Sequence, residues 1–285
     1  MGWPLKASVA LIALLAASDA PAQAESDDQR FQGAAAKLQA ERPGTVDAYV
    51  VVAALDADPV FNREAREAGR VLARRFDAEG RTLVLAHDEG DDKAAVEASP
   101  IELSHALDSV AAKMDRDEDV LVLYTTSHGS PHSGLNFRDP ERGEAVITPP
   151  QLQAMLDQTG AKNRLIILQA CFSGQFVPTL QGPRTVVATA ASALTSSFGC
   201  AAGNDWTFFG YAFVNQAMRQ PDTFERQFRR AWVTILGWEQ KAGYDPSSPQ
   251  ISIGADTAKW LAALDAREPR TASAPVGRPP EEVAQ

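Results

Sequence analysis

Five nearly continuous apolar runs, separated by segments with helical features, constrain the fold of this chain more than any other feature. They are rich in Val, Leu and Ile and occupy residues 48–55, 81–87, 119–126, 164–170 and 184–191. Because apolar residues fill both faces of each run, the runs are typical of strands covered on both sides. Their alternation with helical segments predicts an α/β fold, in which helices cover both faces of a mostly parallel sheet. A shorter run at 249–254 is expected to form an edge strand.

Three of the segments between these runs begin with helix-start signals. SPIE (99–102) and TPPQ (148–151) each place a capping hydroxyl before a proline, with Glu or Gln three residues after the cap. Asp222 and Glu225 repeat this spacing before the run FERQFRRAWVTILGWEQ. We therefore expect a helix to begin directly after each of these three capping positions.

The beginning of the chain has the layout of an export signal. Lys6 precedes an apolar stretch at 7–17, which small residues follow as far as PAQA, so we expect a signal peptide at 1–24. The stretch is shorter than the roughly 20 residues that span a bilayer. We expect an exported protein, periplasmic or secreted, with no stable membrane insertion after signal cleavage. Nothing in the sequence indicates the oligomeric state.

A single domain is expected at 45–265, between a polar N-terminal segment (25–44) and a Pro-rich tail (266–285). The 285 residues are 45% hydrophobic, which is enough for one large domain. Both flanking segments contain too few apolar residues to offset the entropy of ordering them, so we expect them to be flexible and the tail to be disordered. The net charge of -10 offers no basic surface for nucleic acid, which is therefore not an expected partner.

His128 and Cys171 each follow the end of an apolar run, in SHG (127–129) and QACFSG (169–174). Reacting groups of open α/β sheets collect beyond the carboxyl ends of the strands. A histidine beside a cysteine removes the thiol proton or stabilises the nucleophilic thiolate. Gly129 allows close backbone approach, so its N–H and that of Cys171 can donate to an oxyanion. Taken singly, either side chain would be an ordinary loop or core residue, but their matching positions favour a catalytic pair.

The two motifs resemble those of the legumain-type cysteine peptidases, peptidase family C13 of the caspase-like clan, and most closely its bacterial exported members. The resemblance lies in VLVLYTTSHG and LIILQAC and extends loosely from 48 to 260. It implies a three-layer α/β/α sandwich of six strands in the order 2-1-3-4-5-6, with the last strand antiparallel. It also implies that Cys171 is the nucleophile, His128 the general acid/base and Gly129 an oxyanion-hole donor. Peptides or proteins are the implied substrates, and no metal or organic cofactor is expected.

The resemblance also identifies four candidate substrate-binding residues. Gln169 and Tyr211 stand where asparagine-cutting members carry acids, and Ser197 and Arg63 match a pocket wall and a pocket arginine. An amide forms hydrogen bonds but cannot balance a buried charge, so Gln169 disfavours Arg or Lys before the cut. We expect cleavage after a neutral residue such as Asn.

Several alternatives remain open from the sequence. The acyl-enzyme of a cysteine endopeptidase is shared by transamidases and peptide ligases, and the same fold can carry a catalytically silent binding module. The two cysteines, Cys171 and Cys200, can pair in an oxidising compartment. If Cys171 is the nucleophile, both thiols must be reduced in active enzyme. His132 lies in a loop and is expected to be solvated, whereas the aromatic residues at 206–213 are expected to belong to the core.

Overall fold

The computed structural model describes residues 27–87 and 96–280. The expected signal peptide at 1–24 therefore lies outside the described residues. Of the helices in the described part of the chain, none has both the length and the apolar character needed to cross a membrane.

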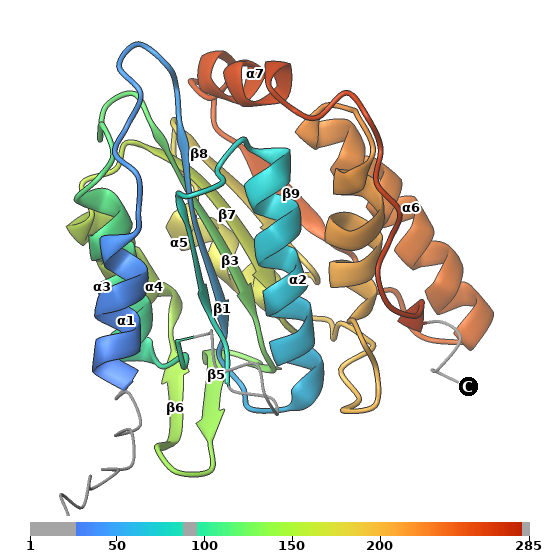
Figure 1. Ribbon diagram of the computed structural model, residues 1–285. Coiled ribbons are helices and arrows are strands. Elements are labelled where there is room, and N and C mark those ends of the chain that lie inside the picture. The colour runs from blue at the N-terminus through green and yellow to red at the C-terminus, as the bar shows by residue number, and fades with distance from the viewer. Residues whose placement is uncertain (1–26, 88–95, 281–285) are drawn as a thin grey trace, which may run out of the picture.

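A six-stranded sheet forms the centre of the molecule (Figure 1). Its strands, in chain order, are β1 (Ala48–Ala54), β2 (Thr82–Leu85), β3 (Val120–Thr126), β7 (Asn163–Gln169), β8 (Thr185–Thr189) and β9 (Gln250–Ile253). The spatial order is β2-β1-β3-β7-β8-β9; all neighbours are parallel except β8 and β9, which are antiparallel. The expected strand order and the antiparallel last strand are both confirmed.

Helices cover the two faces of the sheet in separate layers (Figure 1). One layer contains α2 (Pro59–Arg75), the π-helical segment η2 (Gly210–Gln216), the short η3 (Ala217–Arg219), α6 (Phe224–Ala242) and α7 (Ala258–Ala266). The other contains α1 (Asp27–Ala36), α3 (Pro100–Ala111), α4 (Pro149–Gln158), η1 (Ser173–Phe176) and α5 (Val177–Leu180). Alternate residues of β3 enter the two cores, Val122 and Tyr124 on the α2 side and Leu121 and Leu123 on the α3 side. The fold is thus a three-layer α/β/α sandwich.

Two of the three predicted helix caps are confirmed, and one is displaced by a residue. Ser99 accepts hydrogen bonds from the first backbone N–H groups of α3, and Thr148 forms a reciprocal capping box with Gln151 at the start of α4. The cap of α6 is Thr223, whose hydroxyl accepts from the Arg226 N–H, so the predicted cap at Asp222 was wrong. The Asp222 carboxylate instead pairs with arginine side chains of α6.

The two flanking segments, predicted to be flexible, make defined contacts with the domain in their described parts. Residues 27–36 form α1, which buries Phe31 against the core of the α3 layer. The described part of the tail, up to residue 280, follows the helical layer in an extended path, and the backbone of Val276 bonds Trp206 and Asn215. Hydrogen bonds from buried side chains of the domain hold the tail, and the low apolar content of the tail gives no sign of them.

A small antiparallel sheet, not predicted from the sequence, follows β3. It contains β4 (Gly129–Ser130), β5 (Gly134–Asp139) and β6 (Gly143–Ile147), in that order. The three strands are short and largely polar, so they lack the apolar runs that marked the central sheet. In Figure 1, β5 and β6 extend below the end of the large sheet at which the candidate site lies.

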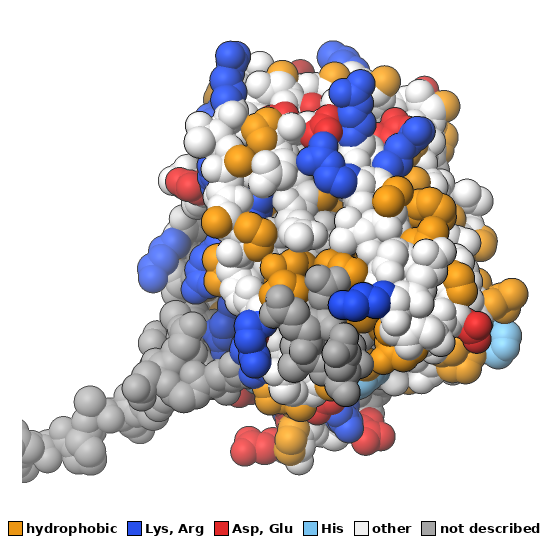
Figure 2. Space-filling view, turned by 90° about the vertical axis from the view of Figure 1, so that its right-hand side faces the viewer, with side chains coloured by type: hydrophobic (Ala, Val, Ile, Leu, Met, Phe, Trp, Pro, Cys, Tyr) orange, Lys and Arg blue, Asp and Glu red, His pale blue; other side chains and the backbone are white. Residues whose placement is uncertain are grey.

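Figure 2 shows the side of the molecule on which α6 lies. The Lys and Arg side chains on this side stand apart from one another among neutral, apolar and acidic ones. They do not merge into one continuous basic area on the surface shown.

Candidate active site

The register of β3 and β7 places His128 and Cys171 at equivalent positions. The two strands are parallel neighbours, and their last paired residues are Thr126 and Gln169. The pairing continues one residue further, because the Ser127 N–H donates to the Gln169 carbonyl at 3.1 Å. His128 and Cys171 therefore each lie two residues beyond the last residue of their strand, at the same edge of the sheet.

The loops that carry these two residues are in direct backbone contact at Gly129. A Cβ atom added to Gly129 would lie 2.0 Å from the carbonyl oxygen of Cys171 and 3.1 Å from the Cβ of Ala170. Real Cβ atoms do not approach a backbone oxygen so closely, so glycine is required here for space. The backbone of Gly129, directly after His128, therefore packs against the backbone of Cys171.

The Cys171 thiol is half-buried and lies against the backbone of Ser197. Its Sγ atom accepts from the Ser197 N–H at 3.3 Å and donates to the Ser197 carbonyl at 3.5 Å. The next residue, Phe172, has φ +58°, an unfavourable conformation for an aromatic residue. Strained backbone of this kind clusters at functional sites, and here it forms the sharp turn after the cysteine. Both Cys171 and Cys200 are free thiols.

The His128 imidazole is held by an acid and an aromatic ring. Its Nε2 atom lies 3.2 Å from Oδ2 of Asp58, and its ring meets the Phe61 ring edge-on at 4.9 Å between centroids. Its side chain is 32% exposed. Within the described residues, the imidazole bonds Asp58 and the sulfur bonds Ser197, with no hydrogen bond between the two. Direct proton transfer between them therefore requires the two side chains to move into hydrogen-bond contact.

Sequence reasoning missed the acids and the arginine behind the imidazole. Arg138 of β5 lies 2.8 Å from Asp58 and 3.1 Å from Asp56, and these acids raise the pKa of its guanidinium. Asp58 stands at the N-cap of α2 but makes no capping bond with its side chain. The signal was present, because both acids follow the first strand as His128 and Cys171 follow theirs.

Two groups of side chains in the described ranges bring possible metal ligands within 4.8 Å of one another. In the group of Asp56, Asp58 and His128, the Arg138 guanidinium already bridges both carboxylates. The other group, His87, Glu97 and Asp139, likewise contains an ion pair, between Glu97 and Arg142. Cations of the chain itself therefore compensate carboxylates in both groups.

The end of the sheet on the α2 side carries a buried polar atom, Oε1 of Gln169, without a hydrogen-bond partner among the described residues. Thr126, which is opposite Gln169 in the β3–β7 register, is also buried, and its hydroxyl hydrogen-bonds the Glu64 carboxyl group. Buried polar atoms are rarely left unpaired, and each such atom calls for an explanation. The unpaired Gln169 oxygen therefore marks a polar position at the end of β7, two residues before Cys171 in the chain.

The other predicted pocket residues have different surroundings. Ser197 is buried and contacts Cys171 through its backbone. Arg63 of α2 donates to the carbonyls of Ala202 and Asn204, at 2.6 Å each, so it holds the loop that follows Ser197. Tyr211 is buried among core aromatics, close to Trp206 and Trp238, and its part in substrate binding stays a prediction. The expected core position of the neighbouring aromatics at 206–213 is confirmed, and His132 is exposed as expected.

Glu64, which sequence reasoning did not identify, connects three elements below the site. Its carboxylate accepts from the Tyr124 hydroxyl at 2.6 Å and from the N–H and hydroxyl of Thr207 at 2.8 Å each. Burial raises the pKa of Glu64 above its usual value. The carboxylate thus joins α2 to β3 and to the segment that leads into η2.

Comparison with known proteins identifies the family of this chain. The model of the peptidase C13 family matches residues 103–258, more than half of the chain. The chain therefore belongs to the peptidase C13 family of legumain-type cysteine peptidases. A solved structure titled "structure of pro-sf-caspase-1" is 11% identical, with a TM-score of 0.44, over 82% of this chain and 93% of that one. No curated protein matches the sequence.

Proposed function

We propose that this protein is a cysteine endopeptidase in which Cys171 is the nucleophile and His128 the general acid/base. The observation that carries the proposal is the equivalent placement of the two residues beyond β3 and β7, with the Gly129 backbone packed against Cys171. Family membership supports peptides or proteins as the substrates.

The contacts of His128 suggest how the reaction proceeds. Asp58 accepts from Nε2–H, which leaves Nδ1 as the basic nitrogen and orients the ring. His128 then takes the thiol proton, and the thiolate attacks the peptide carbonyl carbon. The N–H groups of Gly129 and Cys171 are the proposed donors to the oxyanion. The imidazolium protonates the leaving amine, and water, deprotonated by the same ring, hydrolyses the resulting thioester.

The proposed preference is for a neutral residue such as Asn before the cut. Gln169 offers an unpaired oxygen atom in a buried position two residues before Cys171. A side-chain amide can donate to this oxygen, whereas the neutral Gln169 amide cannot balance the charge of a cation. Peptides with Asn at this position should therefore be cut faster than peptides with Lys or Arg.

The assignment of the nucleophile can be tested with a peptide library and a thiol-directed probe. Cys171→Ala should lose both cleavage and labelling at the active site, whereas Cys200→Ala, which removes the other thiol, should retain labelling at Cys171. Equal cleavage by the wild-type protein and Cys171→Ala would reject the assignment. Mass spectrometry of products formed with an added amine would identify a transamidase or ligase, and labelling without any product would indicate a silent binding module.

We further propose that the enzyme acts outside the cytoplasm, in the periplasm or as a secreted protein. The proposal rests on the signal-peptide layout of residues 1–24. Cell fractionation with sequencing of the mature N-terminus, expected at Glu25, would test it.

A further inference from the structure

Residues 198–206, here called the pocket loop, follow directly on Ser197, whose backbone flanks the Cys171 thiol. Arg63 of α2 holds the loop from one side through the carbonyls of Ala202 and Asn204. Cys200 lies in the loop and is partly buried against the core. This burial is the main cause that raises the pKa of its thiol, and the nearby Cys171 is the second cause. The position of this loop thus affects the surroundings of the nucleophile.

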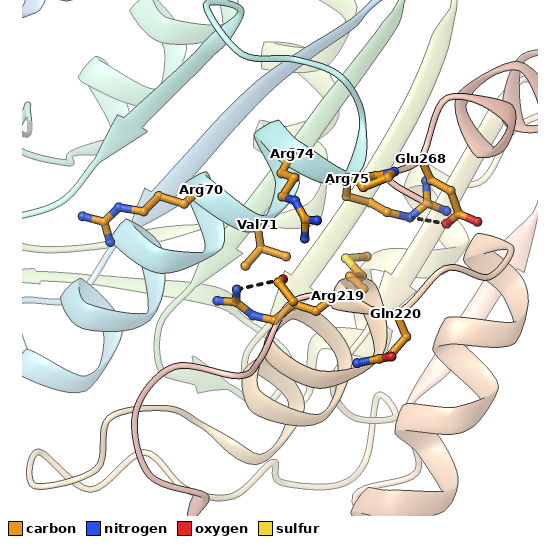
Figure 3. A pocket seen from close by; sticks show the side chains of 10 residues that line it. Arg70, Val71, Arg74, Arg75, Arg219, Gln220 and Glu268 are labelled. Carbon is orange, nitrogen blue, oxygen red and sulfur yellow. Dashed lines mark hydrogen bonds and ion pairs between the residues drawn. The ribbon is translucent and has the colours of Figure 1, made fainter. Parts of the chain in front are cut away.

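Residues 271–278, here called the C-terminal strap, run along the helical layer to the opposite side of the pocket loop. At its start, Arg74 donates to the Thr271 carbonyl at 2.7 Å, and the Ser273 N–H donates to the Arg219 carbonyl at 3.1 Å. A hollow of about 150 Å³ lies at this point. It is lined by side chains of α2 and η3, including Arg74 and Arg219, and by the chain near Glu268 and Ser273 (Figure 3). A second hollow, of about 280 Å³, lies beside Pro275. The strap therefore lacks close apolar packing along this part of its path.

The strap is anchored instead by its backbone at Val276. The Val276 carbonyl accepts from the Trp206 indole at 2.9 Å and from the Asn215 amide at 2.8 Å, and its N–H donates to Asn215 at 3.0 Å. Asn215 and Trp206 are buried, whereas the Val276 side chain is half exposed. Release of the strap would remove the acceptor of the Trp206 indole N–H and of the Asn215 amide N–H, which is unfavourable for buried donors. One of them, Trp206, is the last residue of the pocket loop.

The end of the strap contacts the pocket loop directly at Asp205. Gly277 has φ +80°, and a Cβ atom there would lie 3.1 Å from the Cβ of Asp205, so a larger residue is disfavoured by both conformation and space. The Arg278 N–H donates to the Asp205 carboxylate at 2.9 Å, and its guanidinium donates to the Gly203 carbonyl at 3.3 Å. Asp205 also lies 3.9 Å from Arg63. The pocket loop is therefore held between α2 and the strap.

We propose that the C-terminal strap is a positioning element that holds the pocket loop against α2, so that release of the strap opens the loop and weakens substrate binding. Opening of the pocket loop on release of the strap is a structural change that does not depend on catalysis. The effect on substrate binding rests on the proposed peptidase function.

This structural change can be tested without activity, because the chain contains only two cysteines. In the full-length Cys171→Ala protein, Cys200 is the only thiol and its labelling by a maleimide reports opening of the pocket loop. Gly277→Val should accelerate labelling about tenfold, as expected for a locally opened segment. Ala274→Val, which adds the same side chain at an exposed strap position, should leave the rate unchanged.

Equal labelling rates in all three proteins would overturn the proposal. If Gly277→Val fails to fold, Arg278→Ala can replace it, because this substitution changes an exposed side chain. Arg278→Ala should also accelerate labelling, but by less than tenfold, and Arg278→Lys should restore part of the slow rate. No acceleration in Arg278→Ala would also overturn the proposal. In proteins that retain Cys171, the strap variants should raise KM several-fold with little change in kcat. A fall in kcat at constant KM would contradict the role of the strap in substrate binding, even if the loop opens. Absence of cleavage by the unmodified protein would contradict only the proposed peptidase function.

Discussion

The arrangement of polar residues at strand ends decides what the site can do. Asp58, His128 and Cys171 each follow a buried strand of the central sheet and are partly exposed, so substrate and water can reach them. The acid and the imidazole are in hydrogen-bond contact, and Arg138 holds the acid from the other side. At this scale, the catalytic proposal requires that Asp58 act through its contact with His128 and not through its charge alone.

Asp58→Asn tests that requirement with Asp56→Asn as its matched control. Both acids pair with Arg138, and each substitution removes one negative charge, but the imidazole bonds Asp58. Asp58→Asn should lower kcat roughly 10- to 100-fold because the amide permits the wrong tautomer and orientation of the ring. Steady-state kinetics on an Asn-containing peptide, with thermal unfolding measured in parallel, checks this. Equal losses in the two variants would indicate a general charge effect instead.

At the scale of elements, local signals in the sequence account for where helices begin. The start of α4 combines Pro149 at the first position with a complete capping box, and the helix buries Leu152 and Leu156. Each bond of the box satisfies a backbone or side-chain group at the helix start that would otherwise need water. The cap therefore contributes to stability independently of the active site.

Thr148→Ala should lower the free energy of unfolding by about 1 kcal/mol, because the hydroxyl that accepts from the Gln151 N–H is lost. Thr148→Ser keeps the hydroxyl and serves as the control, with a much smaller loss expected. Urea denaturation of both variants measures the difference. Matching midpoints for Ala and Ser would show that the capping hydroxyl does not stabilise α4.

At the scale of the whole molecule, Glu64 links the helical layer to the sheet. Its carboxylate connects α2 with Tyr124 of β3 and with Thr207 beyond the pocket loop. Because burial raises its pKa above the usual 4.5, the folded chain binds this proton more tightly than the unfolded chain does. The resulting stability is present in full below pH 4.5 and is lost as the pH rises through the folded-state pKa.

Glu64→Gln should therefore flatten the dependence of unfolding free energy on pH above pH 4.5. The amide can accept from Thr207 through its oxygen and donate to the Tyr124 oxygen, so the variant should fold. Chemical denaturation at a series of pH values measures the slope, with Glu225→Gln at a half-exposed position of α6 as the control. An unchanged slope in Glu64→Gln would show that this carboxyl does not control the pH dependence.

Short patterns of amino acids were sufficient to predict the central sheet and the two candidate catalytic residues at its edge. The strands β1, β3 and β7 are each recognisable from an apolar run of a few consecutive residues. The strand order was implied by the resemblance to a known family. Local capping signals likewise located α3 and α4. These features are encoded by residues close together in the chain, so a pattern over a few residues is sufficient to predict them.

Contacts between residues far apart in the chain became visible only in the folded molecule. The pairing of Asp58 with His128, the burial of Tyr211 among core aromatics and the ordering of the strap through Trp206 and Asn215 all join residues far apart in sequence. The strap lacks the apolar residues that mark an ordered segment, because its order comes from hydrogen bonds supplied by the buried side chains of another layer. Such bonds depend on how the two layers pack against each other. No short residue pattern within the strap, or within the segments that contain Trp206 and Asn215, predicts them.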